Sequence, residues 1–163
     1  ALKLAIVATA VFAVGCGTVA KRSCPFTPRD YAAAQKYIDV NGLRMSYVEK
    51  GAGDETVLFV HGLGASVHTW KYNLDEFASR YHVVAVDLPG HGNSDMPDIP
   101  YSVNLHADFI YKFMQEKNIG KAIVVGHSVG GQAAVILALN HPEMVKKLVD
   151  KSVEFPGRLV TGL

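Results

Sequence analysis

One serine in this sequence sits in a pattern that can carry out covalent chemistry. Gly126-His127-Ser128-Val129-Gly130 fits G-x-S-x-G, in which a sharp turn between a strand and a helix exposes the serine. The glycines let neighbouring backbones approach the turn, and the N–H groups of the following helix favour a developing oxyanion. The pattern predicts Ser128 as a nucleophile for acyl transfer. The alternative interpretation is a serine that only caps a core helix.

The elements needed to position this serine are visible in the hydrophobic pattern. Short apolar runs that alternate with helical stretches predict strands buried on both faces of a sheet. We expect these strands at 56–60, 82–88 and 121–125, a further strand from 145 to 149, and helices at 69–79, 102–117 and 128–140. Upstream, 31–35 is expected to form a helical turn. Asn41-Gly42, between alternating segments at 37–40 and 43–48, predicts an antiparallel hairpin.

The order of these elements predicts an α/β fold. It would contain a mostly parallel sheet flanked by helices, with an antiparallel hairpin at the N-terminal side. In such sheets, chemistry takes place beyond the carboxyl ends of the strands. The loops that begin at His61, Asp87 and Gly126 therefore form the candidate site, and Trp70 is expected to pack in the core.

These three loops resemble those of the α/β-hydrolase superfamily, in the same order. The matching segments are Val60-His61-Gly62-Leu63-Gly64, Asp87-Leu88-Pro89-Gly90-His91-Gly92-Asn93-Ser94-Asp95 and Gly126-His127-Ser128-Val129-Gly130-Gly131. The resemblance covers about 37–149, the N-terminal half of the family's fold. It implies that Ser128 is the nucleophile and that the backbone N–H groups of Leu63 and Val129 form the oxyanion hole. It also implies that His61 and Gly62 shape the first loop.

The family's triad continues with an acid and then a histidine, and this order is missing after Ser128. The only later histidine is His141, with no acid between the two. It would lie about 20 Å away, at the far end of the intervening helix. Asp150 is an alternative acid. His91 and His127 are alternative bases, but such residues more often only satisfy local hydrogen bonds. We therefore expect a serine hydrolase for ester-like acyl substrates that is C-terminally incomplete and catalytically poor as this chain.

The N-terminal segment predicts export or attachment to a membrane. Residues 4–20 are almost wholly apolar, with basic residues on both sides, as in a secretory signal. Ala13-Val14-Gly15-Cys16 resembles the lipobox of bacterial lipoproteins, which implies lipid attachment at Cys16. A plain membrane anchor and a buried helix are the alternatives. The expected organisation is a signal or anchor segment with its linker at 1–24 and a partial α/β-hydrolase domain at 25–163.

Composition limits the remaining classes of function. The formal net charge of +1 provides no basic surface for nucleic acid. The scattered histidines and the two N-terminal cysteines lack metal-ligand spacing, so we expect neither a metal nor another cofactor. The expected partners are a small-molecule acyl substrate and a membrane that the N-terminal segment contacts. Two other hypotheses remain: a non-catalytic hydrolase-like module at a membrane surface, and a fragment that does not fold because its last strand is unpaired.

Overall fold

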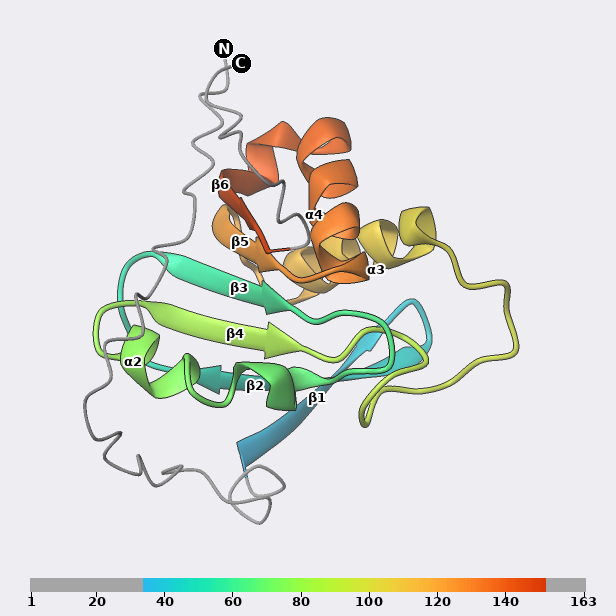
Figure 1. Ribbon diagram of the computed structural model, residues 1–163, viewed down its shortest axis with the longest axis horizontal. Coiled ribbons are helices and arrows are strands. Elements are labelled where there is room, and N and C mark those ends of the chain that lie inside the picture. Colours follow the sequence, from blue (N-terminus) through green and yellow to red (C-terminus); the bar gives the residue numbers. More distant parts are fainter. Residues whose placement is uncertain (1–33, 152–163) are drawn as a thin grey trace, which may run out of the picture.

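A six-stranded sheet organises residues 34–151, the part of the chain that the computed structural model describes (Figure 1). The strand order is β1-β2-β4-β3-β5-β6. β3, β4, β5 and β6 run parallel, whereas β2 is antiparallel to both β1 and β4. The bounds are β1 Gln35–Val40, β2 Leu43–Lys50, β3 Thr56–Val60, β4 His82–Val86, β5 Ala122–Gly126 and β6 Val145–Asp150. The predicted mostly parallel sheet with an N-terminal hairpin is confirmed.

The hairpin turns at the predicted residues. Asn41 and Gly42 both have positive φ, 54° and 77°, as a two-residue turn of this kind requires. The Asp39 carboxylate accepts a hydrogen bond from the Gly42 N–H at 2.9 Å, and this bond stabilises the turn. The strands are longer than expected, and Gln35 already pairs with Val48. The helical turn predicted for 31–35 is therefore wrong at Gln35, and 31–33 lie outside the described residues.

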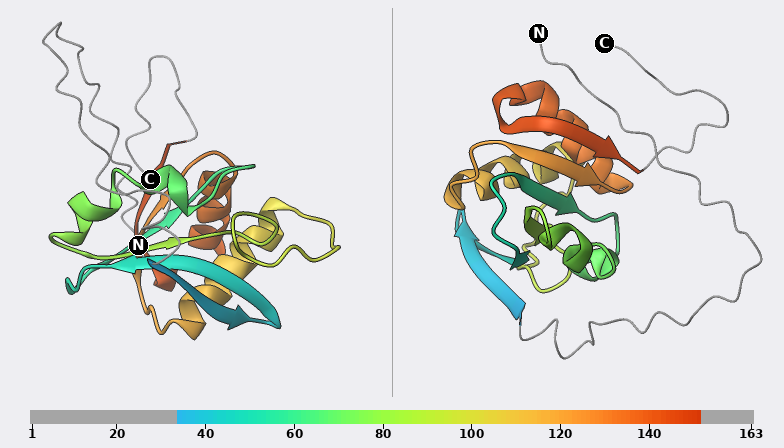
Figure 2. Two further views of the ribbon diagram at one scale, coloured as in Figure 1. Left: turned by 90° about the horizontal axis from the view of Figure 1, so that it is seen from below. Right: turned by 90° about the vertical axis from the view of Figure 1, so that its left-hand side faces the viewer.

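Helices cover both faces of the sheet (Figures 1 and 2). The helices α3 (Val103–Glu116) and α4 (Val129–Asn140) pack together over one core cluster, whereas η1 (Val67–Trp70) and α2 (Leu74–Ala78) pack over the other. The buried strands supply alternate side chains to the two clusters, for example Leu58 to the first and Phe59 to the second. A short 3₁₀ turn, η2 (Pro142–Met144), leads from α4 into β6.

One predicted helix is divided. Instead of a continuous helix over 69–79, η1 and α2 are separated by a turn at 71–73. The N–H groups of Lys71 and Asn73 donate to carbonyl groups three residues earlier, which tightens the backbone and interrupts the α-helical pattern. The turn allows Trp70 and Leu74 to be buried together, and the Trp70 ring lies 4.8 Å from that of Phe59. Trp70 is a core residue, as expected.

The observed ends of the other helices and strands differ from the predicted ends by no more than two residues. Ser102 caps α3 as a helix-starting serine should, because its Oγ accepts the Leu105 N–H at 3.1 Å. The strand predicted at 145–149 extends one residue further, to Asp150. Asp150 pairs with Gly126, and the next N–H, that of Lys151, donates to the Gly126 carbonyl at 2.9 Å. Backbone pairing with β5 therefore extends β6 through a charged residue.

Two sequence predictions concern residues outside 34–151. The N-terminal segment with Cys16, and the chain from residue 152 onward, lie outside the described residues. Within 34–151, no helix is both long enough and apolar enough to cross a membrane.

At the edge of the sheet remote from the candidate loops, Glu49 joins three other elements. Its carboxylate binds Lys36 at 2.9 Å, His82 at 2.8 Å and Lys117 at 3.0 Å. Burial alone would raise the pKa of Glu49, but the hydrogen bonds from these three residues outweigh it and lower the pKa to about 2. The Glu49 cluster therefore connects β1, β2, β4 and the end of α3.

Replacing Glu49 tests this connection. We expect Glu49→Gln to lower the free energy of unfolding at neutral pH by about 1 kcal/mol, allowing for solvent screening of a partly exposed cluster. Because the pKa is lower in the folded state, the carboxylate stabilises the fold above pH 4.5 and loses this effect as the pH falls towards 2. Urea unfolding should therefore separate the two proteins at pH 7, with the difference shrinking below pH 4.5. Glu116→Gln, at an exposed position of α3, is the control, and an equal response of both variants would contradict this role.

Candidate active site

The three predicted loops emerge at one edge of the sheet, because β3, β4 and β5 are parallel. Ser128 lies where β5 turns into α4, with φ 53° and ψ −124°. A non-glycine residue rarely adopts this backbone conformation, which costs about 1–3 kcal/mol. Ser128 occupies the N-cap position of α4, but its side chain makes no capping hydrogen bond. This argues against the interpretation of a serine whose side chain only caps the helix.

The two glycines of the pattern are required by close packing. A Cβ atom on Gly126 would collide with the backbone of Gly130 and Gly131 at the start of α4. A Cβ atom on Gly130 would collide with the carbonyl oxygens of Val60 and His61, at the end of β3. The turn at Ser128 therefore forms only because the helix start can lie directly against two strands.

The first loop brings a backbone donor beside the serine. A Cβ atom on Gly62 would lie 3.0 Å from the Ser128 Cβ, so this loop and the turn at Ser128 touch. Among the described residues, the N–H groups of Leu63 and Val129 donate no hydrogen bond. Leu63 itself is exposed, as expected at the mouth of a site. The structure thus places the two predicted oxyanion donors on segments that flank the nucleophile.

His61 orients the Gly62–Leu63 peptide. The Leu88 N–H donates to His61 Nε2 at 3.0 Å, so the proton of the neutral imidazole is on Nδ1, which donates to the Gly62 carbonyl at 2.7 Å. In a trans peptide, C=O and N–H point in opposite directions. With the Gly62 carbonyl held towards His61, the Leu63 N–H points away from it. Burial lowers the pKa of His61, and His91 adds to this, while Gly62 and Asp87 partly offset it.

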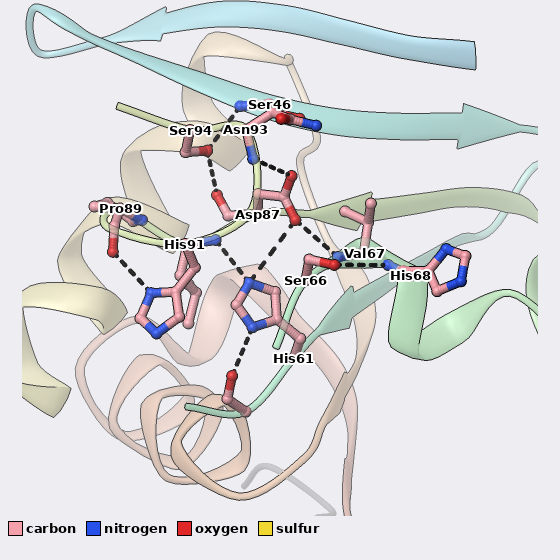
Figure 3. Close-up of polar contacts among 12 residues, drawn as sticks. Ser46, His61, Ser66, Val67, His68, Asp87, Pro89, His91, Asn93 and Ser94 are labelled. Atoms are coloured by element: carbon pink, nitrogen blue, oxygen red, sulfur yellow. Dashed lines mark hydrogen bonds and ion pairs between the residues drawn. The ribbon is translucent and has the colours of Figure 1, made fainter. Parts of the chain in front are cut away.

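Asp87 joins the second loop to the first (Figure 3). Its buried carboxylate accepts the Val67 N–H at 2.7 Å and the Asn93 N–H at 3.1 Å. Gly92 has φ 55° and packs so closely on Asp87 that any side chain there would collide with the carboxylate. Asp87 lies 4.0 Å from His61 Nε2, but that nitrogen already accepts from Leu88. Asp87 is therefore a structural anchor for both loops.

A row of aromatic rings continues from His61 to α3. The His91 ring lies 5.3 Å from that of His61 and 5.8 Å from that of His106, and Tyr101 stacks on His106 at 6.0 Å. His106 is buried and its Nδ1 has no partner among the described residues. Burial, with smaller contributions from His91 and His61, lowers the pKa of His106 to about 4. The His106 ring is therefore predominantly neutral at pH 7 and serves as a packing side chain.

Three of the other candidate triad residues, His141, His91 and Asp150, lie on three different segments of the fold. His141 follows the last residue of α4, at the opposite end from Ser128, and its ring stacks on Tyr111 at 3.6 Å. The Nδ1 of His91 lies 3.0 Å from the Pro89 carbonyl oxygen. Asp150 ends β6 and pairs with Gly126 of the neighbouring strand β5. Gly126 lies two residues before Ser128. Within residues 34–151, no group of three or more histidine, cysteine and acidic residues is arranged to hold a metal ion.

Comparison with known proteins identifies the family. A sequence profile described as alpha/beta hydrolase fold matches residues 55–151, which is more than half of the chain. The chain belongs to the α/β-hydrolase family. It is 47% identical over 116 residues to the dihydrolipoyllysine-residue acetyltransferase component of the acetoin cleaving system of Cupriavidus necator, covering 71% of this chain and 31% of that protein. It is 36% identical over 125 residues to epoxide hydrolase 1 of Caenorhabditis elegans, covering 75% and 31%.

Solved structures of other hydrolases share this fold. A membrane phospholipase A, described as a bacterial virulence factor, superimposes with a TM-score of 0.70 at 33% identity, over 77% of this chain and 42% of that one. An epoxide hydrolase from Vigna radiata gives a TM-score of 0.70 at 30% identity, over 78% and 42%. The chain spans about a third of the length of the first curated relatives and less than half of these solved chains.

Two features of the site escaped sequence reasoning, although the family resemblance had implied that His61 shapes the first loop. The hydrogen bonds that make His61 and Asp87 the anchors of the loops depend on contacts between distant segments, which no local pattern encodes. His106 was missed although a signal existed, because it lies three residues after Val103 on the inward stripe of α3. A histidine on that stripe predicts a buried imidazole.

His61 offers a direct test of the loop's construction. We expect His61→Phe, which keeps a buried ring but removes both hydrogen bonds, to lower the free energy of unfolding by about 1–3 kcal/mol, because the buried Leu88 N–H loses its acceptor. It should also slow reaction of Ser128 with a fluorophosphonate, because the Gly62 carbonyl then keeps only the hydrogen bond from the Ala65 N–H, at 3.2 Å, and the Leu63 N–H is less firmly oriented. The measurements are denaturant unfolding and the rate of labelling. His141→Phe, which keeps the ring stacked on Tyr111, is the control, and indistinguishable results for the two variants would contradict this role.

Proposed function

We propose that this chain carries the nucleophile and oxyanion hole of a serine hydrolase that acts on ester-like acyl substrates. The observation that supports this most is the backbone of Ser128, with φ 53° and a side chain that does not cap the helix it precedes. Strain of this size persists where function requires the resulting geometry. The unused N–H groups of Leu63 and Val129 on the flanking segments add to the case.

In the proposed reaction, Ser128 Oγ attacks the carbonyl carbon of the ester and transfers its proton to a base. The electron pair of the carbonyl π bond moves to the oxygen, which accepts hydrogen bonds from the N–H groups of Leu63 and Val129. Collapse of the tetrahedral intermediate expels the alcohol, which takes the proton from the base. Water then hydrolyses the acyl-enzyme by the same steps in the second half of the reaction.

The nature of the nucleophile favours an acyl substrate over an epoxide. The family resemblance associates an aspartate nucleophile with epoxide hydrolases, whereas Ser128 stands at the turn in this chain. The relatives whose names describe acyl chemistry, an acetyltransferase component and a phospholipase A, are consistent with a serine in this role. No observation on residues 34–151 favours the alternative of a non-catalytic module at a membrane surface.

We further infer that turnover by the 163-residue chain is slow. The family's acid and histidine follow the nucleophile in the chain, and within the described residues the only histidine after Ser128 is His141, at the far end of α4. An oxyanion hole without that pair leaves only a small part of the usual rate enhancement. We also propose that residues 1–24 direct export, with lipid attached at Cys16. This rests on the apolar run and the partial lipobox alone.

Labelling with a fluorophosphonate tests the proposed nucleophile. We expect slow formation of a single adduct on the 163-residue chain, located at Ser128 by peptide mass spectrometry, and its loss by about a thousandfold or more in Ser128→Ala. The control is Ser79→Ala, an exposed serine whose hydroxyl only donates to the Glu76 carbonyl. An adduct that persists in Ser128→Ala, or none on the unaltered chain after long incubation, would contradict the proposal.

A further inference from the structure

His127, the residue before the nucleophile, is placed on the same side of the chain as Ser128. Successive side chains of a strand point to opposite faces, but the positive φ of Ser128 interrupts that alternation. A Cβ atom on Gly62 would lie 3.0 Å from His127 Nδ1 and 3.0 Å from Ser128 Cβ. These two atoms therefore lie no more than about 6 Å from each other, since both are 3.0 Å from one point. His127 Nδ1 and the Ser128 side chain therefore both face Gly62, and we expect the ring nitrogen to reach the serine hydroxyl directly or through one water.

The backbone of His127 is fixed while its ring is available. Its N–H donates to the Val60 carbonyl and its own carbonyl accepts the Gly130 N–H, both at 3.0 Å. The side chain is exposed, and neither ring nitrogen is used in a hydrogen bond or ion pair among residues 34–151. A base needs a nitrogen that can accept a proton and then release it, and this ring meets that condition.

Other histidines of the described residues are less suited to accept a proton from Ser128. Both ring nitrogens of His61 and of His82 are already hydrogen-bonded. The Nδ1 of His91 lies beside the Pro89 carbonyl, the ring of His106 is buried, and His141 lies at the far end of α4. Of these six histidines, His127 is the one for which the structure places a ring nitrogen and the Ser128 Cβ at the same distance, 3.0 Å, from one point.

We infer that His127 acts as the base for the slow reaction of Ser128 in this chain. This rests on the proposed function. As the Oγ–C bond forms, the hydroxyl proton moves to His127 Nδ1 and the π electrons of the carbonyl pass to its oxygen. On collapse, the C–O bond to the leaving group breaks and the departing alkoxide takes the proton back from Nδ1. Among residues 34–151 no acid holds the His127 ring, so we expect its contribution to fall below that of a complete triad.

A purely structural role would have a different signature. If His127 served only as a spacer against Gly62, its replacement would alter the rate without changing the dependence on pH. A base must be neutral to accept a proton, so reaction through His127 should rise as the imidazole deprotonates and then level off.

The experiment measures the pH dependence of phosphonylation of the 163-residue chain by a fluorophosphonate, with the adduct mapped to Ser128. We expect His127→Gln to slow labelling about tenfold or more and to abolish the rise with pH, and added imidazole to restore part of the rate in His127→Ala. His141→Gln, at the remote end of α4, is the control, and thermal unfolding verifies that each variant folds.

Three outcomes would overturn the inference. An unchanged pH profile in His127→Gln, with the adduct still at Ser128, would exclude His127 as the base and leave the proposed function intact. A slower rate with the same profile and no rescue by imidazole would show that His127 is only a spacer. No adduct at Ser128 in the unaltered chain would overturn this inference and the proposed nucleophile together.

Discussion

The turn at Ser128 is the constraint on which the rest of the site depends. A β-strand in the middle of the sheet must become a helix within two residues, which forces a non-glycine residue to φ 53°. The conformation is possible only because Gly126 and Gly130 let the start of α4 lie against the ends of β5 and β3. The energy of this packing offsets the cost of the strained residue. The same close approach places the N-terminus of α4, with its N–H groups, beside the serine.

The loops around the turn are held by buried polar groups. Asp87 accepts N–H groups from two segments, and His61 takes the Leu88 N–H on one ring nitrogen while it holds the Gly62 carbonyl with the other. Each contact satisfies a group that would be costly to leave unpaired in the interior. The Leu63 N–H, which we propose as an oxyanion donor, is thus oriented by hydrogen bonds on the other side of its peptide, and a substrate need not order it. Such preorganised donors are what stabilise charge in a transition state.

The fold was predictable because its signals are local. The apolar runs at 56–60 and 121–125, the Asn41-Gly42 turn and the cap at Ser102 each specify an element within a few residues, and the structure contains all of them. The predictions were wrong where contacts between distant segments decide where a helix or strand begins and ends. The joint burial of Trp70 and Leu74 divides a predicted helix, and pairing with β5 carries β6 through Asp150.

The site was predictable in part for the same reason. The glycine spacing around Ser128 encodes the turn, and the structure contains that turn, with Ser128 at φ 53°. The roles of Ser128 as nucleophile and of Leu63 and Val129 as oxyanion donors come from the pattern and the family resemblance and stay predictions. The hydrogen bonds of His61 and the approach of His127 to Ser128 depend on the meeting of the β3 and β5 loops, which sequence spacing does not reveal.

The most direct test of the account is a crystal structure of the chain after reaction with a phosphonate ester. The account predicts a covalent bond from phosphorus to Ser128 Oγ, with the phosphoryl oxygen within hydrogen-bond distance, about 2.7–3.1 Å, of the backbone nitrogens of both Leu63 and Val129. A phosphoryl oxygen that points away from both N–H groups, or a phosphonate attached to another residue, would contradict it.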